Sequence, residues 1–254
     1  MKMSATMKML AGILVLLFCV QYVSGAPAPD PVVKETLDAL NKRGKDLNDF
    51  TADVTLTTND DLGRDTADLG KVFYQRLGDD ARIRVNFDRK KIGDKVIAQH
   101  HEYILAAGKL IDTNFETKVV VIRQVLKPGQ KLNPLKLGEG PFPLPIGQEP
   151  EEVLKTFAAA RIAPDKEDPA DSTHLELKPK TGTPFFPKFA TIDVFVSKKS
   201  GFPVRIVTTG KDGVHTTRTT DLADIKINAG LKDADFTVPT PGAGWRVRDE
   251  PLQD

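Results

Sequence analysis

Apolar and polar residues alternate strictly along much of this chain, and this constrains the fold more than any other feature. Residues 50–57 (FTADVTLT) and 81–88 (ARIRVNFD) show the pattern most clearly. Successive side chains of a strand point to opposite faces, so Ile83, Val85 and Phe87 share one face of the second segment. The alternation predicts half-buried strands of an antiparallel sheet.

Strand patterns continue over most of the remaining length. They occur at residues 71–76, 98–106, 109–113, 118–125, 173–180, 189–197, 202–209 and 214–227. An antiparallel sheet with this many strands must curl strongly or nearly close. The predicted class is therefore α+β: a single curled antiparallel sheet, an incomplete β-barrel, covered by an amino-terminal helix and a mid-chain helix or lid.

Two segments have helical periodicity. Asp30 and Pro31 form an N-cap and first helical residue, and the predicted helix ends near Gly44. A second helix is expected from about Glu151 to Arg161, with apolar residues along one side. No repeat or change of composition divides the chain, so these elements belong to one domain.

The segment from residue 127 to 150 contains six prolines and four glycines, which excludes a regular strand. Its apolar side chains are too numerous for a free linker. We therefore predict a loop packed over the sheet as a lid, through Leu135, Leu137, Phe142, Leu144 and Ile146.

The first residues have the composition of a signal peptide. Basic residues Lys2 and Lys8 precede the apolar run MLAGILVLLFCV, and small residues follow it. Cleavage after Gly25 is preferred to cleavage after Ala26, which would leave Pro27 just past the cut. We expect residues 1–25 to be removed, residues 26–254 to form the domain, and the mature protein to be exported. An uncleaved anchor is the alternative.

Cleavage would change the chemistry of the chain. It would remove the only cysteine, Cys19, so the mature protein could form neither a disulfide nor a thiolate metal site. Loss of Lys2 and Lys8 would take the formal charge from +1 to −1. This balanced charge predicts no nucleic acid partner. We also expect a monomer.

Three potential metal ligands, His100, His101 and Glu102, stand side by side. Adjacent histidines of a strand point to opposite faces, so both cannot bind one ion without a bulge. We interpret them as ordinary strand residues and predict no metal site. No serine-hydrolase, phosphate-loop or dinucleotide motif is present, and the predicted protein is neither an enzyme nor cofactor-dependent. The sequence leaves open whether two carboxylates meet across the sheet.

The inner side of a curled sheet can be a filled core or an apolar pocket. The apolar lid segment and the small aliphatic residues of the strands favour a pocket, but a filled core fits as well. If a pocket exists, its predicted lipid-binding residues lie in phase on two strands: Val72, Tyr74, Arg76, Ile83, Val85 and Phe87.

The order of motifs resembles the LolA lipoprotein-carrier family over almost the whole chain after the signal. The similar segments are DLNDFTADVTL, GKVFYQR, AAGKLIDTN, IDVFVSKKSGFPVRIVTTGKDG and NAGLKDADFTVPTPGAGWRV. The resemblance implies about eleven strands and helices that cover an apolar cavity. It implies a periplasmic carrier that shields the acyl chains of lipoproteins or lipids during transfer between membranes. An inner-membrane release complex and an outer-membrane acceptor are the implied partners.

Arg76 matches the family's arginine that holds the lid closed and takes part in cargo release. The chain also departs from the family: Leu77 replaces a proline, Ile83 and Val85 replace aromatic residues, and Ile111 replaces a tryptophan. It therefore resembles a divergent branch. Two alternatives share the fold: a periplasmic sensor of envelope stress that binds lipid or lipoprotein, and a secreted structural domain with no ligand.

Overall fold

The computed structural model describes residues 30–59, 65–127, 129–131, 134–135, 146–211, 217–237 and 241–252. The signal segment and most of the proline-rich segment lie outside these ranges. The helices are α1 (Pro31–Asp46), α2 (Pro150–Thr156) and the short 3-10 helix η1 (Asp233–Phe236). The strands are β1 (Asp49–Asn59), β2 (Asp65–Leu77), β3 (Asp80–Ile92), β4 (Lys95–Ala106), β5 (Lys109–Asn114), β6 (Val119–Gln124), β7 (Phe157–Ile162), β8 (Ser172–Pro179), β9 (Phe189–Ser197), β10 (Pro203–Gly210), β11 (Thr217–Ile227) and β12 (Arg246–Glu250).

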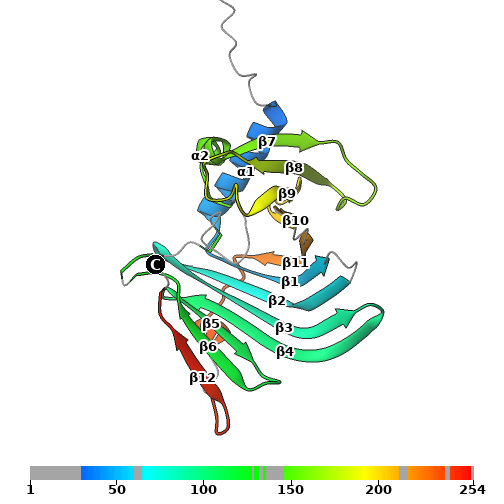
Figure 1. Cartoon of the computed structure of the whole chain (residues 1–254). Coiled ribbons are helices and arrows are strands. Elements are labelled where there is room, and N and C mark those ends of the chain that lie inside the picture. Colours follow the sequence, from blue (N-terminus) through cyan, green and yellow to red (C-terminus); the bar gives the residue numbers. More distant parts are fainter. Residues whose placement is uncertain are drawn as a thin grey trace, which may run out of the picture.

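All the strands belong to one curved, open sheet, which confirms the predicted class (Figure 1). Its order is β12-β6-β5-β4-β3-β2-β1-β11-β10-β9-β8-β7, so β7 and β12 are the two edges. Neighbouring strands are antiparallel except for one pair. The carboxy-terminal strand β12 runs parallel to β6, so the expectation of a wholly antiparallel sheet is wrong at this edge. The sequence pattern did not predict β12, whose residues RVRDE are mainly charged.

Helix α1 begins as its sequence predicts. The Asp30 carboxylate accepts a hydrogen bond from the backbone N–H of Val32 at 2.9 Å, and the helix buries Val33, Leu37 and Leu40. These side chains join the main core together with residues of β8, β9 and β10. Figure 1 shows α1 and α2 at the β7–β10 end of the sheet, while β3–β6 and β12 extend away from it.

The second predicted helix is wrong over its carboxy-terminal half. Helix α2 stops at Thr156, and Phe157–Ile162 form the edge strand β7, paired with β8. The sequence FAAARI has good helix propensity, but pairing satisfies the backbone groups of β7 and buries Phe157 in the core. Tertiary contacts therefore override the local preference.

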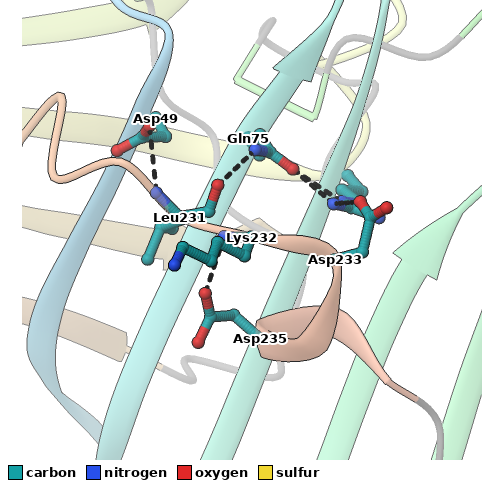
Figure 2. A network of polar contacts seen from close by, with 7 residues as sticks. Asp49, Gln75, Leu231, Lys232, Asp233 and Asp235 are labelled. Atoms are coloured by element: carbon teal, nitrogen blue, oxygen red, sulfur yellow. Dashed lines mark hydrogen bonds and ion pairs between the residues drawn. The ribbon is translucent and has the colours of Figure 1, made fainter.

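The two faces of β1–β5 are covered differently. One face carries Val72, Ile83 and their neighbours, and we call it the pocket face. Residues 228–237, which we call the carboxy-terminal strap, cross the opposite face (Figure 2). The Asp49 carboxylate accepts backbone hydrogen bonds from Gly230 and Leu231 at 3.2 and 3.3 Å.

Contacts farther along the strap extend this network. Gln75 donates to the carbonyl of Leu231 at 2.8 Å, and Arg82 pairs with Asp233 at 2.5 Å. The guanidinium carbon of Arg82 also lies 4.2 Å from the ring centre of Phe236. The strap thereby covers part of the face opposite the pocket face.

Candidate functional site

An apolar pocket of about 240 Å³ lies on the pocket face. Five consecutive strands, β1 to β5, contribute to its walls. Its lining residues are Leu56, Asp68, Ile83, Val85, Phe87, His101, Tyr103, Leu105 and Leu110. Aliphatic and aromatic side chains dominate this set, which is the usual composition of a pocket for an apolar ligand.

The strand register brings these residues together. In the β3–β4 pair, Val85 lies opposite Tyr103, and Phe87 lies opposite His101. Side chains directly opposite each other in an antiparallel pair lie on the same face. The register between β3 and its neighbours shifts next to Phe87, because Asp88 forms a bulge. Bulges turn the strand and re-aim side chains, which helps to hollow the sheet here.

Three of the predicted lipid-binding residues, Ile83, Val85 and Phe87, line the pocket. Val72 and Tyr74 lie on the same face, opposite Val85 and Ile83, but they are buried in the main core instead of lining the pocket. Sequence reasoning did not identify the remaining lining residues: Leu56, Asp68, His101, Tyr103, Leu105 and Leu110. The signal that could have found four of them is the hairpin turn at Ala107–Gly108, which sets the β4–β5 register and so places Leu105 opposite Leu110.

Arg76 lies near the carboxy-terminal end of β2, against the carboxy-terminal end of α1. Its guanidinium donates to the carbonyl of Lys45 at 3.1 Å and to the carbonyl of Gly44. Both of these acceptors belong to α1. The last turn of a helix leaves unpaired carbonyls, and these suit a guanidinium.

Arg76 is nevertheless linked to the lid segment through α1. A Cβ atom built on Gly44 would lie 2.2 Å from the Cα of Gly147, and the Gly147 N–H donates to the carbonyl of Leu40 at 3.2 Å. Two of the predicted lid residues, Leu135 and Ile146, are described, and both are buried in the main core. Leu137, Phe142 and Leu144 lie outside the described residues.

His101 and Glu102 lie on opposite faces of β4, as neighbouring residues of a strand do. His101 faces the pocket, where its Nε2 lies 2.7 Å from the Asp112 carboxylate. Glu102 is buried on the opposite face and accepts hydrogen bonds from Arg84 at 2.9 and 2.5 Å. The ring of His100 stacks on Phe115. Within the described ranges, no group of three or more histidine, cysteine or carboxylate side chains could hold a metal ion.

One end of the pocket is aromatic and acidic. The rings of His101 and Tyr103 stack with centroids 4.6 Å apart, and Phe87 meets Tyr103 edge to face at 6.3 Å. The Asp68 carboxylate accepts a hydrogen bond from Gln99 at 2.7 Å. Burial raises the pKa of Tyr103, and the negative charges of Asp112 and Asp68 raise it further against an opposing effect of Arg123. Burial and two nearby carboxylates therefore both disfavour ionisation of this phenol.

No protein-family model matches the chain, and no curated protein matches its sequence. Several solved structures are similar in fold. An uncharacterized conserved protein from Thermus thermophilus has a TM-score of 0.49 and 15% identity, over 86% of this chain and 99% of that one. A LolA superfamily protein from Nitrosomonas europaea has a TM-score of 0.37 and 13% identity, over 81% of this chain and 97% of that one.

A third structure, the MucA/MucB complex of Pseudomonas aeruginosa, has a TM-score of 0.46 and 11% identity, over 82% of this chain and 61% of that one. These likenesses concern the fold alone. One of the three structures is named as a LolA superfamily protein. No helix of the described residues is long and apolar enough to cross a membrane.

Proposed function

We propose that this protein is a periplasmic carrier that binds one acyl chain of a lipid or lipoprotein in the pocket of β1–β5. The observation that carries the proposal is the pocket itself, whose walls include the apolar face of β3 that the sequence predicts. Burial of an acyl chain stabilises the complex by about 0.8 kcal/mol per methylene. Shielding from water would let such a chain pass between membranes.

The size of the pocket limits the cargo. Ligand sites commonly enclose about 300–1,000 Å³, and this pocket measures about 240 Å³. It therefore suits part of a single chain better than a complete diacyl lipid. The rest of the cargo would remain outside the pocket, and an inner-membrane release complex and an outer-membrane acceptor would be the partners that load and unload it.

Displacement of an acyl-chain fluorophore by fatty acids tests binding directly. Val85 is buried in the pocket wall, so Val85→Asp should place a charge among apolar groups and weaken binding at least tenfold. The matched control is Val96→Asp, the same substitution at an exposed position of β4, which should bind as the wild type does. Circular dichroism verifies that each variant is folded.

The absence of binding by folded wild-type protein at micromolar concentration would refute the proposal. A sensor of envelope stress would share the pocket, so binding alone does not separate the two roles. Transfer of a labelled acyl peptide from donor to acceptor vesicles does, because only a carrier accelerates it. Amino-terminal sequencing of the protein isolated from the cell envelope tests the proposed export and cleavage. The sequence should begin at Ala26.

A further inference from the structure

The two ends of the pocket differ in chemistry. Ile83, Leu105 and Leu110 form an aliphatic end, and β3 pairs with β4 so that Ile83 lies opposite Leu105. At the other end, Asp68 and the aromatic rings of Phe87 and Tyr103 line the wall. A ligand that fills the pocket must match both ends, so an apolar tail alone leaves the second end unused.

We propose that the ligand carries a cationic ammonium head, held between Asp68 and the rings of Tyr103 and Phe87, with its acyl or alkyl tail at the aliphatic end. This inference rests on the proposed acyl-binding function and specifies its substrate class. Ammonium groups bind over the faces of aromatic rings, because the ring quadrupole presents negative charge there. A carboxylate beside the rings adds a formal negative charge.

The charges around the pocket favour a cation over an anion. Among the described lining residues there is one carboxylate, Asp68, and neither lysine nor arginine. The negative charges of Asp68 and Asp112 both act on the Tyr103 phenol and raise its pKa. In the wall, an anionic head would meet the Asp68 carboxylate and one basic side chain, His101, which Asp112 already pairs.

Three basic side chains lie near: His101, Arg123 and Lys90. His101 lines the pocket, and its Nε2 lies 2.7 Å from the Asp112 carboxylate. Arg123 pairs with Glu250 at 2.6 Å and with Asp112 at 3.3 Å, two carboxylates that are not among the lining residues. Lys90 approaches Asp68 at 3.6 Å, which is too long for a hydrogen bond, and its side chain is one-third exposed. A lysine in this position can turn into solvent when a ligand cation takes its place. Lys90 is therefore the expected competitor of the ligand head.

Calorimetry with a series of amphiphiles of equal tail length tests the inference. The probes are dodecyltrimethylammonium, dodecylphosphocholine, dodecyl maltoside and dodecyl sulfate, each below its critical micelle concentration. Dodecyltrimethylammonium should bind about tenfold more tightly than dodecyl maltoside, a difference of about 1.4 kcal/mol, and dodecyl sulfate should bind most weakly. If dodecylphosphocholine binds as tightly as dodecyltrimethylammonium, the source of the cation is a phospholipid head. If it binds more weakly than dodecyltrimethylammonium, the source is a simple alkylammonium. Both results support a cationic head.

Variants locate the head group. Asp68→Asn and Tyr103→Leu should each bring the affinity ratio of dodecyltrimethylammonium to dodecyl maltoside close to one, whereas Lys90→Gln should increase it. Asp79→Asn is the matched control, since Asp79 is exposed and pairs with Lys131; it should keep the wild-type ratio.

The failures of the two proposals are distinguishable. If none of the amphiphiles binds the folded protein, the acyl-binding function and the head-group inference both fail. If the cationic, neutral and anionic probes bind equally well, the pocket binds acyl chains but the head-group inference is wrong. Persistence of the cationic preference in both Asp68→Asn and Tyr103→Leu would also overturn it.

Discussion

At the scale of single residues, Arg76 tests how α1 is attached to the sheet. Its guanidinium donates to the Gly44 and Lys45 carbonyls, the last of α1, where a cation is favoured. Arg76→Leu should lower the free energy of unfolding by about 1–2 kcal/mol, since the residue is partly exposed. It should also accelerate amide exchange at Gly147, whose N–H donates to α1.

If Arg76 acts as a latch, as the family resemblance implies, the same variant should change the release rate of an acyl ligand about tenfold, in line with about 1.4 kcal/mol. Arg89→Leu is the control, because Arg89 is exposed and pairs only with its neighbour Asp88 among the described contacts. If Arg76→Leu and the wild type release the ligand and exchange amides at equal rates, Arg76 is only a surface charge and not a latch.

The two tyrosines of the chain after Ala26 predict how stability depends on alkaline pH. Burial raises the pKa of Tyr74, against a smaller opposing effect of Arg76, and the pKa of Tyr103 is raised as well. A raised folded pKa means that stability is fully present below the unfolded value of about 10 and is lost as pH rises through the folded pKa. Tyrosinate absorbance and circular dichroism should therefore change together, above pH 10.

Tyr74→Phe with Tyr103→Phe should move this alkaline unfolding to higher pH, because the variant contains no buried phenol to ionise. Ionisation near pH 10 with an unchanged circular dichroism spectrum would contradict the prediction, since it would mean that both phenols ionise freely in the folded protein.

The sequence predicts which face a residue occupies better than it predicts the residue's neighbours. Alternation placed Ile83, Val85 and Phe87 on one face and separated His101 from Glu102, and both predictions are confirmed. It did not place Asp68 in the pocket. The predicted strand began at residue 71, whereas β2 begins at Asp65 and carries Asp68 in phase with Val72. Pairing with β1 and β3, and not the pattern of β2 alone, extends the strand to Asp65.

At the scale of elements, the contact between α1 and the lid segment depends on two glycines. A Cβ on Gly44 would meet the backbone of Gly147 at 2.2 Å, and neither backbone can give way as a flexible side chain would. Gly147 itself has a φ of +76°, which favours glycine. Gly44→Ala should therefore destabilise the protein by about 1–3 kcal/mol, although alanine is the better helix former.

Urea unfolding measures this effect. Gly242→Ala is the matched control, because a Cβ there would meet nothing nearer than the Trp245 ring at 3.9 Å and the backbone is not in the left-handed region. A Gly44→Ala variant as stable as wild type would show that α1 and residues 146–147 are not packed together as described.

Helix boundaries show where local signals are sufficient. The start of α1 is encoded in Asp30 and Pro31 alone, so the sequence predicts it. The end of α2 is different, because residues 157–162 have helix-forming alanines and become a strand only through pairing with β8. Strand β12 was missed for the same reason: its charged residues form a strand by pairing in parallel with β6.

At the scale of the whole molecule, the carboxy-terminal strap holds together elements that are far apart in sequence. It connects to β1 through Asp49 and to β2 through Gln75 (Figure 2). It connects to β3 through Arg82 and Arg84. The Arg84 guanidinium donates both to the buried Glu102 carboxylate and to the Asp235 carbonyl at 2.9 Å. The strap therefore supplies a further acceptor to the Arg84 side of a buried ion pair, whose partners are costly to leave unsatisfied.

A chain that ends at Asn228 should lose at least about 3 kcal/mol of unfolding free energy. It lacks the buried side chain of Phe236, and Arg84 loses the Asp235 carbonyl as an acceptor. A chain that ends at Thr237 keeps the strap and lacks residues 238–254, which include β12. It should retain most of the wild-type stability. Urea unfolding of the two truncated chains and the full chain measures the difference. Equal losses in both truncations would assign the stabilisation to β12, and the strap would then be a passive connection between β11 and the edge of the sheet.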